Sequence, residues 1–572
     1  NVAGGAVREQ SSLKRWLAQQ SLGEWATVVV ILALFWASRY WHAASFGLYE
    51  DDLTIIPGGW ERSFFDLLGY LNSFYIGNFN RIGHPVHFML IYLFSYAGHA
   101  LAGLQGVYAI AFLIEAVNIL LAYSLFRRLS GRTFAVLGAL AYALFSADTT
   151  QAFLTHALGI QPAVTLLLLG AHAYLSDRKA WTFVCALAVL FIYETTFPVF
   201  LALPLLRRPW SKRTWRDLLL FGLILVAMLG GSYLMRYLGG EKRVSTLDIK
   251  STLLLPFEHM LQGPFVSLGS YLLRPYQALK GLTLEIGLAA AAGFAAIAAL
   301  LWRLPFSRDW GSRAEDRKLP SGLADLLQLL AAGAALLVLA YPMTFTVRAY
   351  AITGRDTRVH SAAVLGAALV VAVVLTMLFK WAGRRLRLPL LGVTALVFAL
   401  VFGFGFSVQQ EYITAWKLQQ QLWTEIVRLA PDAGENTVIL VEAGGLQDTR
   451  QIGANTWNLP RILNQLYRMP AEWESPPRVY RLVPHWEDNL VTDSGTFRLD
   501  FTTVTAPPSL YGEVAPENVI FLDSRSGQLT RRDQPLPVGG QSFALKPAGD
   551  ALLPQLPRGL LFDLLVPDGN QP

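Results

Sequence analysis

Three consecutive carboxylates, Glu50-Asp51-Asp52, are the residues of this sequence best suited to acid–base chemistry. They come a few residues after a long apolar run, and carboxylates that close to hydrocarbon are costly unless they face water, a cation or a polar cavity. A solvated loop is the simplest explanation. The functional explanations are a general base at Asp51 or Asp52, or a divalent cation held by all three carboxylates.

Other carboxylates occupy the ends of apolar runs. Asp148 follows the run 132–147, and Glu194 lies in the turn between the runs 180–193 and 195–206. Both are candidates for substrate binding, and a role at a helix end explains either one equally well. Glu115 lies inside an apolar run, where we predict a structural polar contact between helices.

Arginines supply the complementary charge. Arg348, Arg355 and Arg358 belong to one polar segment between apolar runs. Arginine binds phosphate through two parallel hydrogen bonds, so these residues are candidates for a phosphate group. An internal salt bridge to Asp356 is the structural alternative.

A further group of candidates precedes the apolar stretch 84–104. Arg81 and His84 are candidate substrate-binding residues, whereas the pattern His84-Pro85-Val86-His87 is too weak to predict a metal site. Arg274 and Lys280 are predicted to end another outer loop.

The composition indicates which elements position these residues. Hydrophobic residues make up 53% of the 572 residues and charged residues only 15%, against roughly 25% in soluble domains. The single cysteine excludes a disulfide framework and a cysteine-based metal site, and no phosphate-binding glycine motif is present. The basic residues lie in short loops between apolar runs, so we expect no nucleic-acid partner.

A bilayer core requires about 20 apolar residues in a helix. On this basis we predict about eleven transmembrane helices in an α-helical polytopic membrane protein. The runs are 24–44, 106–126, 132–147, 158–175, 180–193, 195–206, 217–238, 281–302, 322–342, 361–380 and 388–407.

Loop charge predicts the orientation. If residues 1–23 are a cytoplasmic N-terminal segment, alternation of sides places 22 of the 34 basic residues before residue 408 in cytoplasmic loops or segments. Counting 84–104 as a span would invert every later loop. We therefore predict an outer loop 45–105 in which 84–104 forms a re-entrant or interfacial helix.

The chain changes character after the last run. Residues 408–572 contain 13 basic and 19 acidic residues, and they are predicted to form a soluble extracytoplasmic domain. An amphipathic helix is expected at 409–430, and strands are expected at 436–441, 478–483 and 518–522. This pattern indicates a small α/β or mostly β domain.

A series of motifs in residues 20–410 resembles the multipass glycosyltransferases of the GT-C fold, in particular the protein O-mannosyltransferase branch. The motifs are Asp51-Asp52 after the first span, the segments 80–85, 125–129, 143–145 and 193–198, and Gly354-Arg355-Asp356-Thr357-Arg358 before a late helix. The sequence departs from that family at 147–151, where a His-Pro…Glu element is common, and in the late motif, which lacks its aromatic residue.

The resemblance implies a GT-C-like transmembrane domain over 24–407 and a polyprenyl-phosphate-linked sugar as donor. It also implies that Asp51 or Asp52 is the catalytic base and that Arg355 or Arg358 contacts the lipid phosphate. The acceptor would be an extracytoplasmic protein or glycan, and the protein would lie in the plasma (inner) membrane.

Two alternatives remain open at this stage. The first is a non-catalytic GT-C-like scaffold or accessory subunit that binds partner subunits through its C-terminal domain. The second is a transporter of lipid-linked sugars, which the location of most ionisable residues at span ends disfavours.

Overall fold

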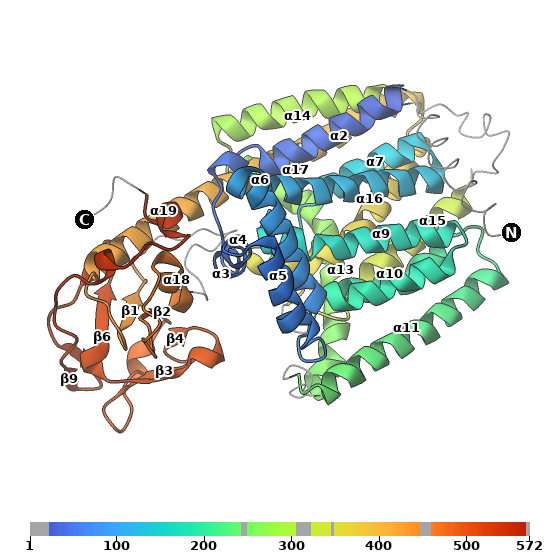
Figure 1. The fold of residues 1–572 in the computed structure, drawn as a ribbon. Helices are drawn as coiled ribbons and strands as arrows, with labels where there is room; N and C mark the ends of the chain where they lie inside the picture. The colour runs from blue at the N-terminus through green and yellow to red at the C-terminus, as the bar shows by residue number, and fades with distance from the viewer. Residues whose placement is uncertain are drawn as a thin grey trace.

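The computed structural model describes residues 22–150, 152–241, 249–304, 322–344, 348–446 and 459–567. A stack of long helices makes up most of the protein, and a small domain that contains all the described strands lies beyond one end of the stack (Figure 1). Most of the predicted segment 1–23 lies outside the described residues, and so does the basic loop 305–321.

Seven helices in the described residues are long and apolar enough to cross a membrane. They contain α2 (Leu22–Tyr40), α6 (Pro85–Ser130), α8 with α9 (Leu154–Gly159, Gln161–Leu175), α11 (Lys212–Leu238), α14 (Leu284–Trp302), η4 with α16 (Arg355–Ala363, Val364–Trp381) and α17 (Gly383–Leu429). Four shorter apolar helices are α7 (Arg132–Ala143), α10 (Lys179–Ile192), η3 (Glu194–Leu206) and α15 (Leu323–Val338). Together they overlap all the predicted spans, and the number of crossings stays a prediction.

The short predicted pair 180–193 and 195–206 forms two different kinds of helix. The first is the α-helix α10, and the second is the 3₁₀ helix η3, which contains Pro198 and Pro204. A 3₁₀ helix rises about 2.0 Å per residue against 1.5 Å in an α-helix. The 13 residues of η3 therefore reach about 26 Å, close to the thickness of a bilayer core.

The stretch 84–104 forms the first part of α6, which bends at Ala102 and Gly103. Gly103 has a φ of 58°, and this left-handed conformation favours glycine. At the bend, a Cβ on Gly106 would lie 2.0 Å from the carbonyl oxygen of Gly98, so only glycine allows the two arms to come this close. The first arm lies beside α5 (Phe64–Tyr70) and crosses the direction of the second (Figure 1).

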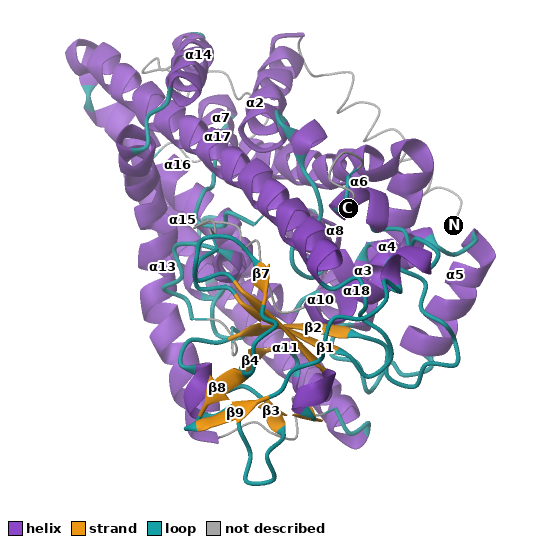
Figure 2. Ribbon diagram, turned by 90° about the vertical axis from the view of Figure 1, so that its left-hand side faces the viewer, coloured by secondary structure: helices purple, strands orange, loops and turns teal. Residues whose placement is uncertain are grey.

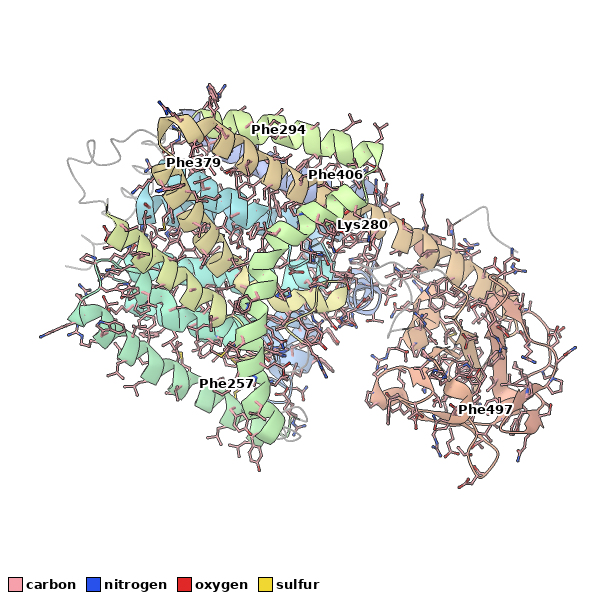
Figure 3. All side chains as sticks on the ribbon, turned by 180° about the vertical axis from the view of Figure 1, so that it is seen from behind. Phe257, Lys280, Phe294, Phe379, Phe406 and Phe497 are labelled. Carbon is pink, nitrogen blue, oxygen red and sulfur yellow. The ribbon has the colours of Figure 1, made fainter. Side chains whose placement is uncertain are left out.

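Where an outer loop was predicted to end at Arg274 and Lys280, the structure has a helix, and the side of the membrane on which this segment lies stays a prediction. Both residues belong to α13 (Ile249–Lys280), a helix that crosses the direction of its neighbours (Figure 3). Proline removes a backbone hydrogen bond from a helix, and α13 contains Pro256, Pro264 and Pro275. The sequence therefore suggested a loop, although helices packed within a membrane protein often tolerate internal proline.

The helix α17 continues without interruption from the last predicted span into the predicted amphipathic helix, and it connects the stack to the small domain (Figure 2). On the small domain, Gln420 of α17 donates a hydrogen bond to the carbonyl of Leu564 in α19 (Phe562–Leu565) at 2.9 Å. The helix α18 (Leu459–Leu466) packs against α3 (Asp52–Ile55), which contains one of the predicted site carboxylates.

The small domain has a five-stranded mixed sheet in the order β4-β2-β1-β6-β7. The predicted strands are β1 (Val438–Glu442), β2 (Arg478–Leu482) and β6 (Val519–Asp523), and both β2 and β6 pair parallel with β1. β4 (Val504–Thr505) and β7 (Thr530–Arg531) form the antiparallel edges. The two-stranded pairs are β3 (Phe497–Leu499) with β5 (Gly512–Val514), and β8 (Leu536–Val538) with β9 (Gln541–Phe543).

Side chains alternate across the central strand of this sheet. Ile439 and Val441 join the hydrophobic core that is continuous with the helix stack, whereas Val438 and Leu440 belong to a separate core on the other face. The domain is therefore α/β, and one face of its sheet packs toward the helices.

Candidate functional site

The acidic segment is held against α17 by aromatic contacts. The ring of Trp416 lies so close to Gly47 that a Cβ there would be 1.8 Å from a ring atom. The Tyr49 hydroxyl donates to the carbonyl oxygen of Tyr412 at 2.9 Å and accepts a hydrogen bond from the Gly47 N–H at 3.1 Å. These contacts fix the backbone immediately before the three carboxylates.

Asp52 is fully buried, and its carboxylate binds backbone rather than a cavity. Its Oδ1 accepts a hydrogen bond from the Thr155 N–H at 2.8 Å, and its Oδ2 accepts one from the Leu154 N–H at 3.1 Å. Burial raises the pKa of Asp52 to about 6, against the opposing effect of these N–H donors. Asp52 therefore fixes the first turn of α8 to α3, which is a structural role for one of the two predicted base candidates.

Glu50 and Asp51 both bind Arg355, from the 3₁₀ helix η4. The Arg355 Nη1 lies 3.2 Å from Glu50 Oε2, and Nη2 bonds to Asp51 Oδ2. The fold thus brings two polar segments together although about three hundred residues separate them in the sequence. Asp51 and Arg355 are each 26% exposed, whereas Glu50 is 8% exposed.

Glu50 has two unusual properties. Its φ is 50°, and a left-handed conformation costs a non-glycine residue roughly 1–3 kcal/mol. Burial raises the pKa of its carboxyl to about 7, although the positive charge of Arg355 opposes this shift. Glu50 therefore gains and loses its proton near neutral pH.

A small, narrow cavity lies where these groups meet. It is lined by Tyr49, Glu50, Asp51, Phe153, Thr155, His156 and Arg355. Carboxylates of one segment and the guanidinium of another line this cavity, which is the arrangement expected for a phosphate-bearing substrate with a base beside it.

The polar environment extends from this cavity toward Asp148. The Asp148 Oδ1 accepts hydrogen bonds from the N–H and the hydroxyl of Thr150 at 2.8 and 2.7 Å, and the Thr150 hydroxyl also contacts His156 Nδ1 at 2.8 Å. Arg358 interacts electrostatically with Glu50 and Asp148, and it forms no ion pair with a described residue.

His84 and Glu194 form a second pair in the same region. The His84 Nδ1 lies 2.7 Å from Glu194 Oε2. The His87 ring stacks with Tyr193, and a Cβ on Gly159 would lie 2.3 Å from that ring. The structure therefore brings together the start of α6, the start of η3 and the end of α8.

Two predicted site residues lie apart from this cluster. Arg81 is exposed and makes no side-chain hydrogen bond to a described residue. Arg348 is exposed, and its Nη1 donates to the Tyr350 hydroxyl at 3.1 Å. The geometry gives neither residue a place in the cavity.

The geometry also argues against a cation held by Glu50, Asp51 and Asp52. No group of three His, Cys, Asp or Glu side chains within the described ranges is arranged to hold a metal ion. Glu50 and Asp51 bind Arg355 while Asp52 binds the backbone of α8, so the three carboxylates do not converge on one point.

The ion pairs of Arg355 go to the acidic segment and not to Asp356 or to the described residues of the small domain. In that domain, Asp432 pairs with Arg531 and Asp523 pairs with Arg525. The site residues that the sequence reading missed are Thr155 and His156. The sequence signal was weak because their segment reads as an ordinary apolar helix start.

No family model matches the chain, and no curated protein is significantly similar to it.

Proposed function

We propose that this protein is a multipass membrane glycosyltransferase of the GT-C type, which moves a sugar from a polyprenyl-phosphate carrier to an extracytoplasmic acceptor. The observation that carries this proposal is the meeting of Glu50 and Asp51 with Arg355 at one cavity. A lipid-linked donor needs a cation for its phosphate and a base for the acceptor hydroxyl, and it requires no nucleotide site. Sugar transfer by the purified chain, supplied with a panel of polyprenyl-phosphate sugars, is the direct test.

In this proposal Asp51 is the general base, because its carboxylate lines the cavity and is partly exposed. Arg355 and Arg358 attract the phosphate of the donor. Glu50 forms an ion pair with Arg355, and Asp52 is a positioning residue that holds α8. Asp148, Glu194 and His84 shape the surrounding polar wall.

The strongest observation for a scaffold instead is that Arg355 already has two carboxylate partners. A closed pair of this kind can join two distant segments without any chemistry. The two functions differ in their response to a phosphate group. In an enzyme of the proposed kind, Arg355 exchanges a carboxylate contact for a contact with the phosphate, whereas in a scaffold it keeps both carboxylate contacts.

Donor binding is expected to depend on pH through Glu50. Glu50 faces Arg355, Asp51, Arg358 and Asp52. With Asp51 charged, protonation of Glu50 below a pKa of about 7 changes the net charge of Glu50, Asp51, Arg355 and Arg358 from zero to +1. A short-chain prenyl phosphodiester, which itself does not titrate near pH 7, should therefore bind about tenfold more tightly at pH 6 than at pH 8.

The Glu50→Gln variant isolates this effect, because it keeps the nearby His84, His87 and His156. Calorimetric titration should give a tight and nearly constant Kd for the phosphodiester between pH 6 and 8 in this variant. A variant that keeps the full pH dependence of the wild type would assign that dependence to Asp52 or the histidines and contradict the role given to Glu50.

We propose that the helix stack lies in the plasma (inner) membrane, with residues 1–23 in the cytoplasm and residues 408–572 outside. Cysteines introduced at Ser130 and Ser526, in a background with Cys185→Ala, test this orientation. An impermeant thiol reagent should label position 526 in intact cells and position 130 only after permeabilisation. Labelling of both positions from the same side contradicts the orientation.

A further inference from the structure

Two buried arginines lie in the helix stack away from the proposed catalytic cavity. Arg39, at the end of α2, is 6% exposed, and Arg274, on α13, is 1% exposed. Neither forms an ion pair with any residue that the structure describes. A buried charge without a close partner costs several kcal/mol, so the surroundings of these side chains require an explanation.

One hydrogen bond from each arginine goes to a neutral carbonyl group just after the end of α7. Arg39 Nη2 donates to the Phe145 carbonyl at 2.5 Å, and Arg274 Nε donates to the next carbonyl, that of Ser146, at 3.0 Å. The remaining Arg274 donors bind Ile352 O and Gln277 Oε1, both at 2.8 Å. The two guanidinium groups are close enough to repel each other electrostatically.

A second small cavity lies beside these groups. It is lined by Ser38, Arg39, Leu144, Ser146, Val401, Phe404 and Gly405. The Arg274 guanidinium covers the ring of Phe404, at 4.6 Å from the ring centre. The Ser146 hydroxyl is buried and has no hydrogen-bond partner among the described residues, and an unsatisfied buried hydroxyl is costly.

Carboxylates attract the two arginines only from a distance. Glu115 and Asp148 interact electrostatically with Arg39, and Glu411 interacts with Arg274. Asp148 already accepts two hydrogen bonds from Thr150. An anion in the cavity would meet Arg39 and the free Ser146 hydroxyl directly, with the charge of Arg274 behind the Phe404 ring.

We propose that the cavity between α2, α7 and α17 is a second anion site that binds a phosphate monoester group. Arg39 and the Ser146 hydroxyl can donate directly to such a dianion, and the charge of Arg274 adds attraction from behind the Phe404 ring. This cavity shares no lining residue with the one at Glu50 and Asp51. The inference therefore goes beyond the proposed transfer reaction and does not depend on it. The group is carried either by a lipid or by a free phosphate.

Calorimetric titration of the purified full-length chain in a neutral detergent tests this site with two probes, dodecyl phosphate and inorganic phosphate. Ser146→Val removes the unpartnered hydroxyl and fills space in the cavity without breaking a hydrogen bond, so it should fold normally. It is expected to weaken binding at least tenfold, and Arg39→Gln should weaken binding further. Ser407→Ala is the matched control, because the Ser407 hydroxyl bonds only to its own helix at Phe404 O, at 2.7 Å.

Binding of dodecyl phosphate alone identifies a lipid as the source of the group, and binding of both probes identifies the phosphate itself as sufficient. Both results support the site if Ser146→Val weakens binding and Arg358→Gln, in the first cavity, leaves it unchanged. The proposal is overturned if neither probe binds the wild type. It is equally overturned if Arg358→Gln abolishes binding while Ser146→Val does not.

Discussion

Replacement of Asp51 by asparagine is expected to lower the rate of sugar transfer by ~10²–10⁴, the usual contribution of a general base. The amide keeps the shape of the side chain and cannot accept the proton of an acceptor hydroxyl. Arg355 retains its contact with Glu50 at 3.2 Å, so the fold around the cavity should survive. The measurement is the initial rate of transfer from a polyprenyl-phosphate sugar, at equal amounts of folded protein.

Asp356→Asn is the matched control for this variant. Asp356 follows Arg355 directly in η4 and is exposed, so its loss should leave the rate unchanged. A normal rate in Asp51→Asn combined with a lost rate in Glu50→Gln would move the base to Glu50. Normal rates in both variants would favour the scaffold.

Replacement of Asp52 by alanine is expected to act on stability instead. The change leaves the N–H groups of Leu154 and Thr155 buried without an acceptor, and each unsatisfied group costs roughly 1–3 kcal/mol. The free energy of unfolding should therefore fall by about 2–6 kcal/mol. Loss of tertiary signal in a detergent-solubilised thermal melt measures the effect.

Asp52→Asn is an intermediate variant, because the single side-chain oxygen of asparagine can still accept one of the two hydrogen bonds. Its stability should lie between that of the wild type and that of Asp52→Ala. Asp51→Ala serves as a control, since the N–H groups of Leu154 and Thr155 donate to Asp52. If Asp52→Ala and Asp51→Ala melt at the same temperature, the capping role assigned to Asp52 is wrong.

These two neighbouring carboxylates show what could be predicted from the sequence. Its apolar runs overlap the long helices, and three short β-rich runs are the three parallel strands β1, β2 and β6. Charged residues are rare in the apolar part of the chain, so the segments around Asp51 and Arg355 stood out as candidates for one site. The structure brings the two segments together. Whether that pair performs catalysis stays a prediction.

The division of roles among Glu50, Asp51 and Asp52 could not be predicted from sequence. It depends on the left-handed backbone at Glu50, which turns adjacent side chains toward different partners. The helix α13 was missed for a different reason. Proline disfavours a helix interior, so its internal prolines predicted a loop, whereas packing against neighbouring helices keeps the segment helical. The buried Arg274 was thereby assigned to a loop, and its position behind Phe404, beside the second cavity, was not predicted.

The continuity of α17 has a mechanical consequence. At 1.5 Å per residue, its 47 residues form a rod about 70 Å long that rises out of the helix stack into the outer domain. Such a rod sets both the distance of that domain from the helix stack and its rotation about the helix axis. One residue inserted near Gln409 would turn the domain by about 100° and separate α18 from α3. The position of the small domain relative to the cavity at Glu50 and Asp51 is therefore set by the length of a single helix.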